Sequence, residues 1–351
     1  MTIKTPQPPG VRKADHLRIV LEETVEPPGV MNGFEQFRFD HDALPEIDRE
    51  DVSIETTLFG KPLHAPLIIG AMTGGTNEAG AINRVLAEAA EERGIAMALG
   101  SQRIMLEDAT TTPSFQLRDI APTIPLIGNI GAIQLNYGVS TDDIRRLIDQ
   151  TEVDALMLHL NPLQEAIQPG GDTRFAGLAD KIGLLAETLD CPLLVKEVGA
   201  GLSERTAGLL AGLPIAGVET AGVGGTSWAL VESFRTEDAT QREAGRELAT
   251  WGVPTAESLL ICREAFPDRL VIASGGIRTG VEIAKAIALG ADAVALAGPL
   301  LHAANRGVEP VLETLDALTE TLKTILFVTG SRDLDQLEDH AVLRYLPEEH
   351  A

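Results

Sequence analysis

Seven consecutive residues, 159–165 (HLNPLQE), bring together an imidazole, two amides and a carboxylate. The preceding residues 155–158 (ALML) are apolar and typical of a buried strand. The following residues 168–172 (QPGGD) are typical of a loop. In barrels of parallel strands, polar residues that gather where a strand ends often line a ligand site. The segment therefore predicts one wall of an active site.

A second chemical signal is the glycine-rich segment 274–280 (SGGIRTG), which follows an apolar run and opens a helical stretch. Paired glycines let the backbone approach an anion, and a helix N-terminus offers free N–H groups to it. Residues 297–300 (AGPL) repeat the pattern after the next apolar run. Because the loops after the last two strands of a barrel commonly bind phosphate, the two segments predict a phosphate site. The alternative is that their glycines only make tight turns.

A lysine, Lys196, directly follows the apolar residues 192–195 (PLLV). On a barrel strand such a side chain must face the lumen or the mouth, where it needs an anionic partner. It could form a Schiff base with a carbonyl substrate, or it could stabilise negative charge on a bound cofactor. The structural alternative is an ion pair with the neighbouring Glu197.

Three further segments combine small residues with one hydrogen-bonding side chain: 72–75 (MTGG), 100–103 (GSQR) and 128–131 (GNIG). Exposed backbone groups beside hydroxyl and amide side chains suit a flat polar ring lying across a barrel mouth. Residues 224–228 (GGTSW) add another hydroxyl-bearing glycine loop. Ordinary turn formation would explain any one of these segments, but it explains three consecutive strand ends less well.

Charged residues near these segments indicate a metal-assisted diphosphate site. Glu165 is a lone carboxylate, and one carboxylate with water and a diphosphate is a usual arrangement for Mg²⁺. Arg12, Lys13 and Arg103 could complete a cationic clamp on the same phosphates. The alternative for Glu165 is a solvated helix residue, and for Arg12 and Lys13 an ordinary charged N-terminal segment.

The elements that must carry these segments alternate regularly from residue 67 onward, as short apolar runs followed by helical stretches. The pattern predicts an α/β fold, a closed (β/α)8 TIM barrel with an N-terminal extension, and an open doubly wound sheet is the alternative. The expected strands are 67–72, 95–100, 125–131, 155–160, 192–199, 215–222, 270–276 and 291–298. The expected helices are 78–93, 141–150, 175–189, 203–212 and 280–289, with a tail helix at 309–329.

Two domain-level features follow from this alternation. Residues 1–62 are expected to form an N-terminal extension packed on the barrel, and residues 63–351 a single barrel domain. The longest connection contains a polar insertion at about 229–255. Such an insertion on the C-terminal side of a barrel is typical of a mobile lid.

Bulk composition limits the class of partner. The chain has 351 residues, and 44% of them are hydrophobic, which is enough for a sizeable core. Its 52 acidic and 28 basic side chains give a formal net charge of −24, which disfavours nucleic acid and anionic membranes as partners. Cys191 and Cys262 lie in no metal-like spacing, and no signal-peptide core or membrane-spanning run is visible. We therefore expect a reduced, cytoplasmic protein.

Taken together, these segments closely resemble the type 2 isopentenyl-diphosphate isomerases, the FMN-dependent kind. The resemblance covers nearly the whole chain, from an Arg-Lys-x-Asp-His opening at 12–16 to SGGIRTG at 274–280. GSQR, HLNPLQE and GGTSW in combination are specific for this family. SGGIR alone would indicate only a flavin or phosphate barrel.

The resemblance implies roles for individual residues. FMN would be contacted by Met72, Thr73, Gly74, Ser101, Asn129, Lys196 and Thr226, and its phosphate by Gly275, Gly276, Arg278, Ala297 and Gly298. Substrate would be contacted by Arg12, Lys13, Ser101, Gln102, Arg103, His159, Asn161 and Gln164, with Mg²⁺ on Glu165. The catalytic residues would be Gln164, Lys196 and His159.

The implied reaction is a 1,3-allylic proton shift that interconverts isopentenyl and dimethylallyl diphosphate in isoprenoid biosynthesis. Reduced FMN would act as the acid–base catalyst, NADPH would only reduce the flavin, and Lys196 would favour the anionic reduced form. The resemblance also implies a homo-tetramer or homo-octamer.

Two other functions stay open on the sequence. A flavin-dependent oxidoreductase of the 2-hydroxy-acid oxidase or nucleotide dehydrogenase kind would use the same phosphate loops. It would need a catalytic His–Arg pair or a nucleophilic cysteine, and neither cysteine ends a predicted strand. A non-catalytic flavin-binding barrel would not explain why substrate-type residues fill four separate loops.

Overall fold

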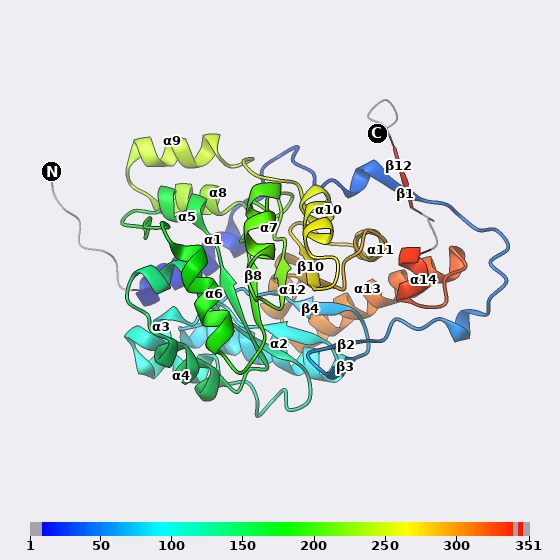
Figure 1. Ribbon diagram of the computed structural model, residues 1–351, viewed down its shortest axis with the longest axis horizontal. Coiled ribbons are helices and arrows are strands. Elements are labelled where there is room, and N and C mark those ends of the chain that lie inside the picture. The colour runs from blue at the N-terminus through cyan, green and yellow to red at the C-terminus, as the bar shows by residue number, and fades with distance from the viewer. Residues whose placement is uncertain (1–8, 340–342, 347–351) are drawn as a thin grey trace.

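Eight parallel strands close into a barrel at the centre of the molecule (Figure 1). The computed structural model describes residues 9–339 and 343–346. Residues 1–8 of the predicted extension, and residues 340–342 and 347–351, lie outside the described part. The last barrel strand, β11, pairs with the first, β4, and the sheet is therefore closed. The predicted (β/α)8 fold is confirmed and the open sheet is excluded. The barrel strands are β4 (Leu67–Ile69), β5 (Ala96–Ala98), β6 (Leu126–Gly131), β7 (Ala155–His159), β8 (Leu193–Lys196), β9 (Gly217–Glu219), β10 (Leu270–Ser274) and β11 (Ala293–Leu296).

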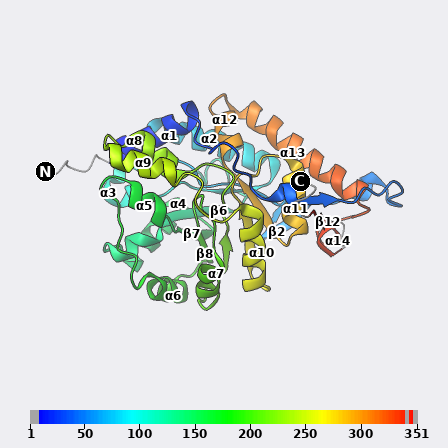
Figure 2. The ribbon, with the colours of Figure 1, turned by 90° about the horizontal axis from the view of Figure 1, so that it is seen from above.

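Helices surround these strands (Figure 2). Side-chain caps fix where several of them begin, and Ser140 and Thr279 each complete a capping box with the acidic residue three positions on. The six predicted helices correspond to α2, α4, α6, α7, α11 and α13. The helices are α1 (Pro9–Glu22), α2 (Asn77–Arg93), α3 (Arg103–Glu107), α4 (Thr141–Thr151), α5 (Pro162–Ile167), α6 (Leu178–Thr188), α7 (Glu204–Ala211), α8 (Trp228–Arg235), α9 (Ala239–Glu247), α10 (Thr255–Ala265), α11 (Gly280–Ala288), α12 (Gly298–Ala304), α13 (Val308–Val328) and α14 (Leu334–Asp339).

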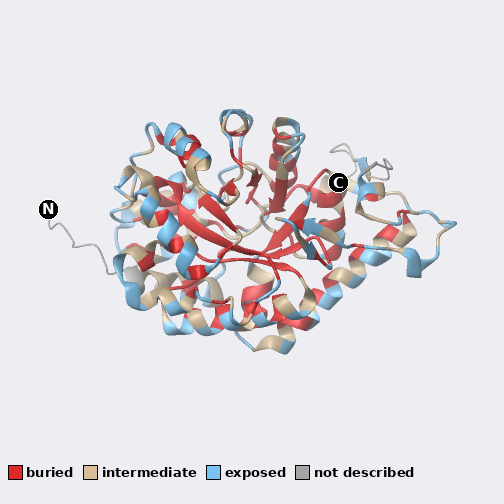
Figure 3. Ribbon diagram, turned by 60° about the horizontal axis from the view of Figure 1, so that its bottom comes forward, coloured by how far each residue is buried: buried red, intermediate tan, exposed pale blue. Residues whose placement is uncertain are grey.

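Side chains alternate along each strand between the barrel lumen and the outer helices. Ile127, Met157 and Leu194 pack together inside the lumen. Their neighbours, such as Leu156 and Val195, pack outward beneath the helices. Figure 3 shows the strands as the buried centre of the molecule. Since residues two apart on a strand share a face, the next inward position after each apolar residue faces the mouth of the barrel.

The N-terminal extension contacts both ends of the barrel. At one end α1 lies beside α8 in Figures 1 and 2. At the other end the antiparallel hairpin of β2 (Thr56–Leu58) and β3 (Lys61–Leu63) adds Leu58 and Leu63 to the lumen core. A separate pair, β1 (Phe37–Phe39) and β12 (Leu343–Tyr345), joins the extension to the C-terminal region.

The insertion predicted at about 229–255 contains two helices. α8 packs against α9, α5 and α1, so this segment is joined to the rest of the molecule on several sides. Its movement as a lid stays a prediction. Among the described residues, no helix has the length and apolar character needed to cross a membrane.

Candidate active site

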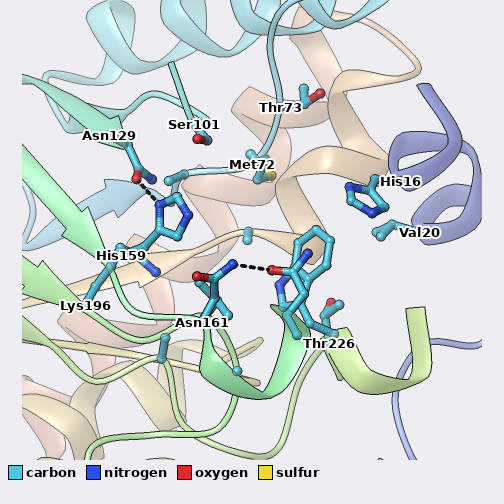
Figure 4. Close-up of a pocket in the computed structure, with 18 of the residues that line it drawn as sticks. His16, Val20, Met72, Thr73, Ser101, Asn129, His159, Asn161, Lys196 and Thr226 are labelled. Carbon is cyan, nitrogen blue, oxygen red and sulfur yellow. Dashed lines mark hydrogen bonds between the residues drawn. The ribbon is translucent and has the colours of Figure 1, made fainter. Parts of the chain in front are cut away.

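A layer of polar side chains lies directly above the apolar barrel core and forms the floor of a pocket (Figure 4). Each stands two residues beyond an inward position of its strand, as His159 does after Met157. The pocket above this floor holds about 1860 Å³ of empty space, its open mouth included. The strand period itself therefore aims these side chains at a ligand. The layer comprises Asn129, His159, Lys196, Glu219 and Ser274.

His159 is held as a neutral hydrogen-bond acceptor. Its Nδ1 lies 2.7 Å from the side-chain oxygen of Asn129, so Nδ1 carries the ring proton and Nε2 keeps its lone pair. Burial, reinforced by the charges of Lys196 and Lys13, lowers the pKa of His159 to about 3. The ring can therefore orient a ligand but cannot supply a proton near neutral pH.

We expect His159 to remain neutral from about pH 5 to pH 9, because ionising it would place a second cation beside Lys196 in a buried site. Ring nitrogen chemical shifts of histidine-labelled protein check this, with the His159→Gln variant identifying the signal. A titration step within that range that disappears in the variant would contradict the assignment.

Lys196 is 6% exposed, and its Nζ lies 3.2 Å from a carboxylate oxygen of Glu219. Nζ also donates a hydrogen bond of 2.6 Å to the backbone oxygen of Glu197. The Glu197 carboxylate instead accepts hydrogen bonds from the three successive backbone N–H groups of residues 198–200. The ion pair with Glu197 that the sequence left open is therefore not formed, and the anionic partner of Lys196 is Glu219.

The HLNPLQE segment places an amide and a carboxylate together at the start of α5. The side-chain nitrogen of Asn161 donates to Gln164 at 3.1 Å and to Glu165 at 3.0 Å. The other carboxylate oxygen of Glu165 accepts from the backbone N–H of Asp172 at 2.6 Å and from Gln168 at 3.2 Å. Burial raises the pKa of Glu165, although these hydrogen bonds oppose the shift. Within the described residues, no group of three or more metal-ligating side chains occurs, so a cation at Glu165 would need ligand and water oxygens.

Behind Gln164 lies a carboxylate that the sequence did not single out. Glu232, on α8, is completely buried and accepts hydrogen bonds from Gln164 at 3.1 Å and from His16 at 2.8 Å. Its other oxygen accepts from Arg235 at 2.5 Å. Burial alone would raise the pKa of Glu232, but the contacts with His16 and Arg235 outweigh burial and lower it. The insertion and the N-terminal helix thus meet at the amide of Gln164.

Three cations gather at the mouth of the pocket, as the sequence predicted. Arg12 and Lys13 come from α1, and Arg103 is the first residue of α3. Lys13 donates a 2.5 Å hydrogen bond to the backbone oxygen of Ser101, and Arg103 pairs with Asp172 at 2.7 Å. Burial and the charge of Arg12 lower the pKa of Lys13 to about 7, and burial and Arg103 lower that of Arg12. Arg12 and Lys13 are partly buried, and their lowered pKa values show that their charges repel, which favours an anionic ligand beside them.

We expect Lys13 to take up about one proton when a diphosphate ligand binds at about pH 8.5, and almost none when it binds at about pH 6. At the higher pH Lys13 is neutral in the free protein, because its pKa is about 7, and the ligand's negative charge restores the proton. Calorimetry of inorganic pyrophosphate binding in two buffers of different ionisation enthalpy measures this uptake. Lys13→Arg keeps its charge at both pH values, so equal uptake in that variant would contradict the assignment.

The predicted phosphate loop is shaped by backbone crowding. Gly276 has a φ of 69°, and a Cβ there would lie 2.2 Å from the backbone oxygen of Gly224. Arg278 donates to that oxygen at 3.0 Å and pairs with Glu26 of the extension at 2.5 Å. On the neighbouring strand, α12 begins after Ala297 with no side-chain cap, which leaves its first N–H groups without that partner. Both loops line the pocket, and their glycines let the backbone pack closely there.

Comparison with known proteins identifies the family. Residues 164–344 match the FMN-dependent dehydrogenase family. An isopentenyl-diphosphate delta-isomerase of Nostoc sp. is 48% identical over 335 residues, which cover 95% of this chain and 96% of that protein. One of Stutzerimonas stutzeri is 48% identical over 334 residues, with 95% and 96% covered. The chain belongs to the isopentenyl-diphosphate delta-isomerase family. The match to an FMN-dependent family identifies the type 2 branch.

Solved structures agree on the fold of this isomerase. A chimera of (S)-mandelate dehydrogenase superposes with a TM-score of 0.65 at 21% identity, covering 95% of this chain and 98% of that one. Flavocytochrome b2 superposes with a TM-score of 0.69 at 16% identity, covering 94% and 82%. At such low identity the likeness shows the fold alone.

The pocket of the isomerase collects most of the site residues that the sequence predicted. It is lined by Arg12, Lys13, Met72, Thr73, Ser101, Arg103, Asn129, His159, Asn161, Gln164, Glu165, Lys196, Thr226, Gly275, Gly276, Arg278, Ala297 and Gly298.

Two predicted residues, Gln102 and Gly74, do not line the pocket. Gln102 is 0% exposed, and its side chain donates to Thr151 at 3.1 Å and accepts from the backbone N–H of Asn129 at 2.8 Å. The side chain of Gln102 thus supports Asn129 from behind, and its predicted substrate contact stays a prediction. Gly74 faces Phe115, where a Cβ would come within 2.1 Å of the ring, so its contribution is the room it leaves for that ring.

The isomerase site also contains residues to which the sequence assigned no individual role. Glu219 and Ser274 lay inside predicted strands, and the alternation of the strand would have found them. His16 and Glu232 are 216 positions apart, and no local pattern connects them.

Proposed function

We propose that this isomerase interconverts isopentenyl and dimethylallyl diphosphate by a 1,3-allylic proton shift, with reduced FMN and Mg²⁺ in the pocket. The observation that carries the proposal is the meeting, in one pocket, of a cationic mouth and a polar barrel floor. The cations suit a diphosphate and the floor suits a flat polar ring. Relatives that are 48% identical over almost their whole length carry the corresponding name.

The residues present fit FMN. Gly275 and Gly276 expose backbone where a Cβ would collide, and the uncapped start of α12 faces the same end of the pocket, so both suit its phosphate. Met72, Thr73, Asn129, Lys196 and Thr226 would hold the ring system. When bound and reduced, FMN supplies the acid and base for the proton shift and an electron-rich face for a developing tertiary cation.

The chain's own part begins with binding the diphosphate. Its oxygens would be held by Arg12, Lys13 and Arg103. Protonation of Lys13 on binding would strengthen the interaction with the diphosphate. Glu165 is held in place by Asn161 and Gln168, so it can offer a carboxylate oxygen to Mg²⁺ shared with the diphosphate. Fixing the charged end of the substrate leaves its alkene to be placed by the barrel floor.

The reacting end of the substrate would lie among Asn161, Gln164 and His159. Because His159 is neutral and the other two are amides, these groups orient the alkene without themselves ionising. Lys196 would place positive charge beneath the pocket and so favour a negatively charged ring system there. Glu232 is buried and accepts a hydrogen bond from Gln164, so it would be the carboxylate that takes up a proton through this amide.

Anaerobic turnover of isopentenyl diphosphate tests the proposal, with FMN, Mg²⁺ and NADPH omitted in turn. We expect dimethylallyl diphosphate only when the flavin is reduced and Mg²⁺ is present, with NADPH consumed once per flavin rather than once per product. Dithionite should replace NADPH. Bound flavin that oxidises a 2-hydroxy acid and does not isomerise would overturn the proposal.

A further inference from the structure

The floor of the pocket contains an ion pair, Lys196 and Glu219, and the carboxylate of Glu219 has few hydrogen-bond partners. Glu219 is 3% exposed and sits directly across from Lys196 in the pairing of β8 with β9. One carboxylate oxygen meets Lys196 at 3.2 Å and accepts a 2.7 Å hydrogen bond from the Ser274 hydroxyl. The other oxygen, Oε2, is buried and has no hydrogen-bond partner among the described residues.

This arrangement leaves much of the carboxylate charge unsatisfied. A buried carboxylate is normally surrounded by several donors, as Glu197 is by three backbone N–H groups. Glu219 has instead one hydroxyl and one ammonium, and both come from the same pocket floor. In surroundings of low polarity, an incompletely screened charge acts strongly on its neighbours.

Ser274 fixes the direction in which this charge points. Its hydroxyl oxygen accepts a 3.0 Å hydrogen bond from the backbone N–H of Ala221, so its proton is free to go to Glu219. The serine therefore holds the carboxylate oxygen on the side of Lys196. The side chains of Lys196, Glu219 and Ser274 lie one layer above the apolar lumen core.

We propose that Glu219 is a positioning residue that acts through Lys196: it holds the ammonium at the flavin site and offsets part of its charge. The inference rests on the proposed binding of FMN. Lys196 alone would strongly favour the anionic reduced ring, and Glu219 moderates that preference. The pair would thus set how readily the bound flavin is reduced and how firmly it stays reduced.

Glu219→Gln separates charge from shape. The amide has the same size and its oxygen can still accept from Ser274 and Lys196, but the negative charge is gone. We expect reduction of bound FMN to become about tenfold more favourable, which raises the midpoint potential by about 30 mV for two electrons. Lys196→Met should lower the potential. Ser274→Ala should also lower it, because the carboxylate loses the hydroxyl that screens it.

A double variant tests whether Glu219 acts through the lysine. In a Lys196→Met background Glu219 has no ammonium to hold or offset, so adding Glu219→Gln should change the potential little. Glu219→Asp, which keeps the charge, should stay nearer to the wild-type value than Glu219→Gln. Spectroelectrochemical titration of the flavin-loaded proteins gives the potentials of the wild type and the five variants. The dissociation constant of oxidised FMN verifies that each pocket is intact.

The outcomes are distinct. The inference is overturned if Glu219→Gln changes the equilibrium constant for flavin reduction by less than about twofold. It is also overturned if Glu219→Gln shifts the potential equally in the Lys196→Met background. If Glu219→Gln failed to retain flavin, the downward shift expected for Ser274→Ala would decide instead. The expected shifts in a protein that does not isomerise would support this inference and overturn the proposed reaction. Failure of the wild-type protein to bind FMN would overturn both.

Discussion

Replacing Lys196 by methionine is expected to lower kcat/KM for isomerisation by about 10²–10³-fold while FMN still binds, because a buried, preorganised charge is lost. The length of the side chain is nearly kept, so the floor of the pocket should not collapse. Steady-state turnover of isopentenyl diphosphate with reduced FMN measures the loss. Flavin absorbance after desalting shows that the cofactor remains.

The same substitution also leaves the buried carboxylate of Glu219 without its ion-pair partner. Breaking a buried ion pair from one side commonly costs about 3–5 kcal/mol, so the melting temperature should fall as well. The Lys196→Met/Glu219→Gln double variant removes the stranded charge and is the matched control. We expect it to recover stability but not turnover. Recovery of both would mean that Lys196 matters to folding rather than to the reaction.

The fold could be predicted from the sequence because a parallel barrel repeats one local pattern. Each strand is short and buried on both sides, so it appears as an apolar run such as 155–158, and each run is followed by a helix. The predicted strands ran two or three residues too far at several C-terminal ends. For 67–72 the strand ends at Ile69, the N–H of Gly70 makes a last hydrogen bond to Leu296, and residues 70–72 line the pocket. Apolar composition does not show where hydrogen bonding to the neighbouring strand stops.

The direction in which a side chain points was harder to predict than the position of the strand that carries it. Within a strand, the alternation of side chains distinguishes inward from outward positions. By this rule Glu219 and Lys196 both occupy inward positions of their strands. Past the strand end the alternation is lost. Ser101 and Gln102 are neighbours, yet the first lines the pocket and the second is turned into the protein to hold Asn129. Nothing in the tetrapeptide GSQR distinguishes these two orientations.

Contacts made by distant segments could not be predicted at all from local patterns. Arg12 and Lys13 had the right chemistry, but only α1 lying against α8 brings them to the mouth. Glu232 sits in an insertion whose sequence suggested a lid and nothing more. Its burial between His16 and Gln164 depends on three helices meeting. Such a residue becomes visible only in three dimensions.

Replacing Glu232 by glutamine is expected to lower kcat by about 10²-fold or more, because proton transfer by a placed group commonly contributes 10²–10⁴-fold. The carboxylate accepts from Gln164, His16 and Arg235, which are all donors. An amide can accept on one side only, so its nitrogen must face one of these donors. The orientation of Gln164 is then lost together with the carboxylate that would take up a proton beside it.

The pH dependence distinguishes a proton-holding role from a purely structural one. The contacts with His16 and Arg235 lower the pKa of Glu232, so in the wild type any fall in kcat from protonating it should appear only well into the acid range. Glu232→Gln should be slow at every pH and should lack that acid limb. Glu243→Gln, an exposed carboxylate on the neighbouring α9, is the control and should keep both rate and profile. If Glu232→Gln kept the acid limb at a reduced rate, the carboxylate would be orienting Gln164 without holding a proton.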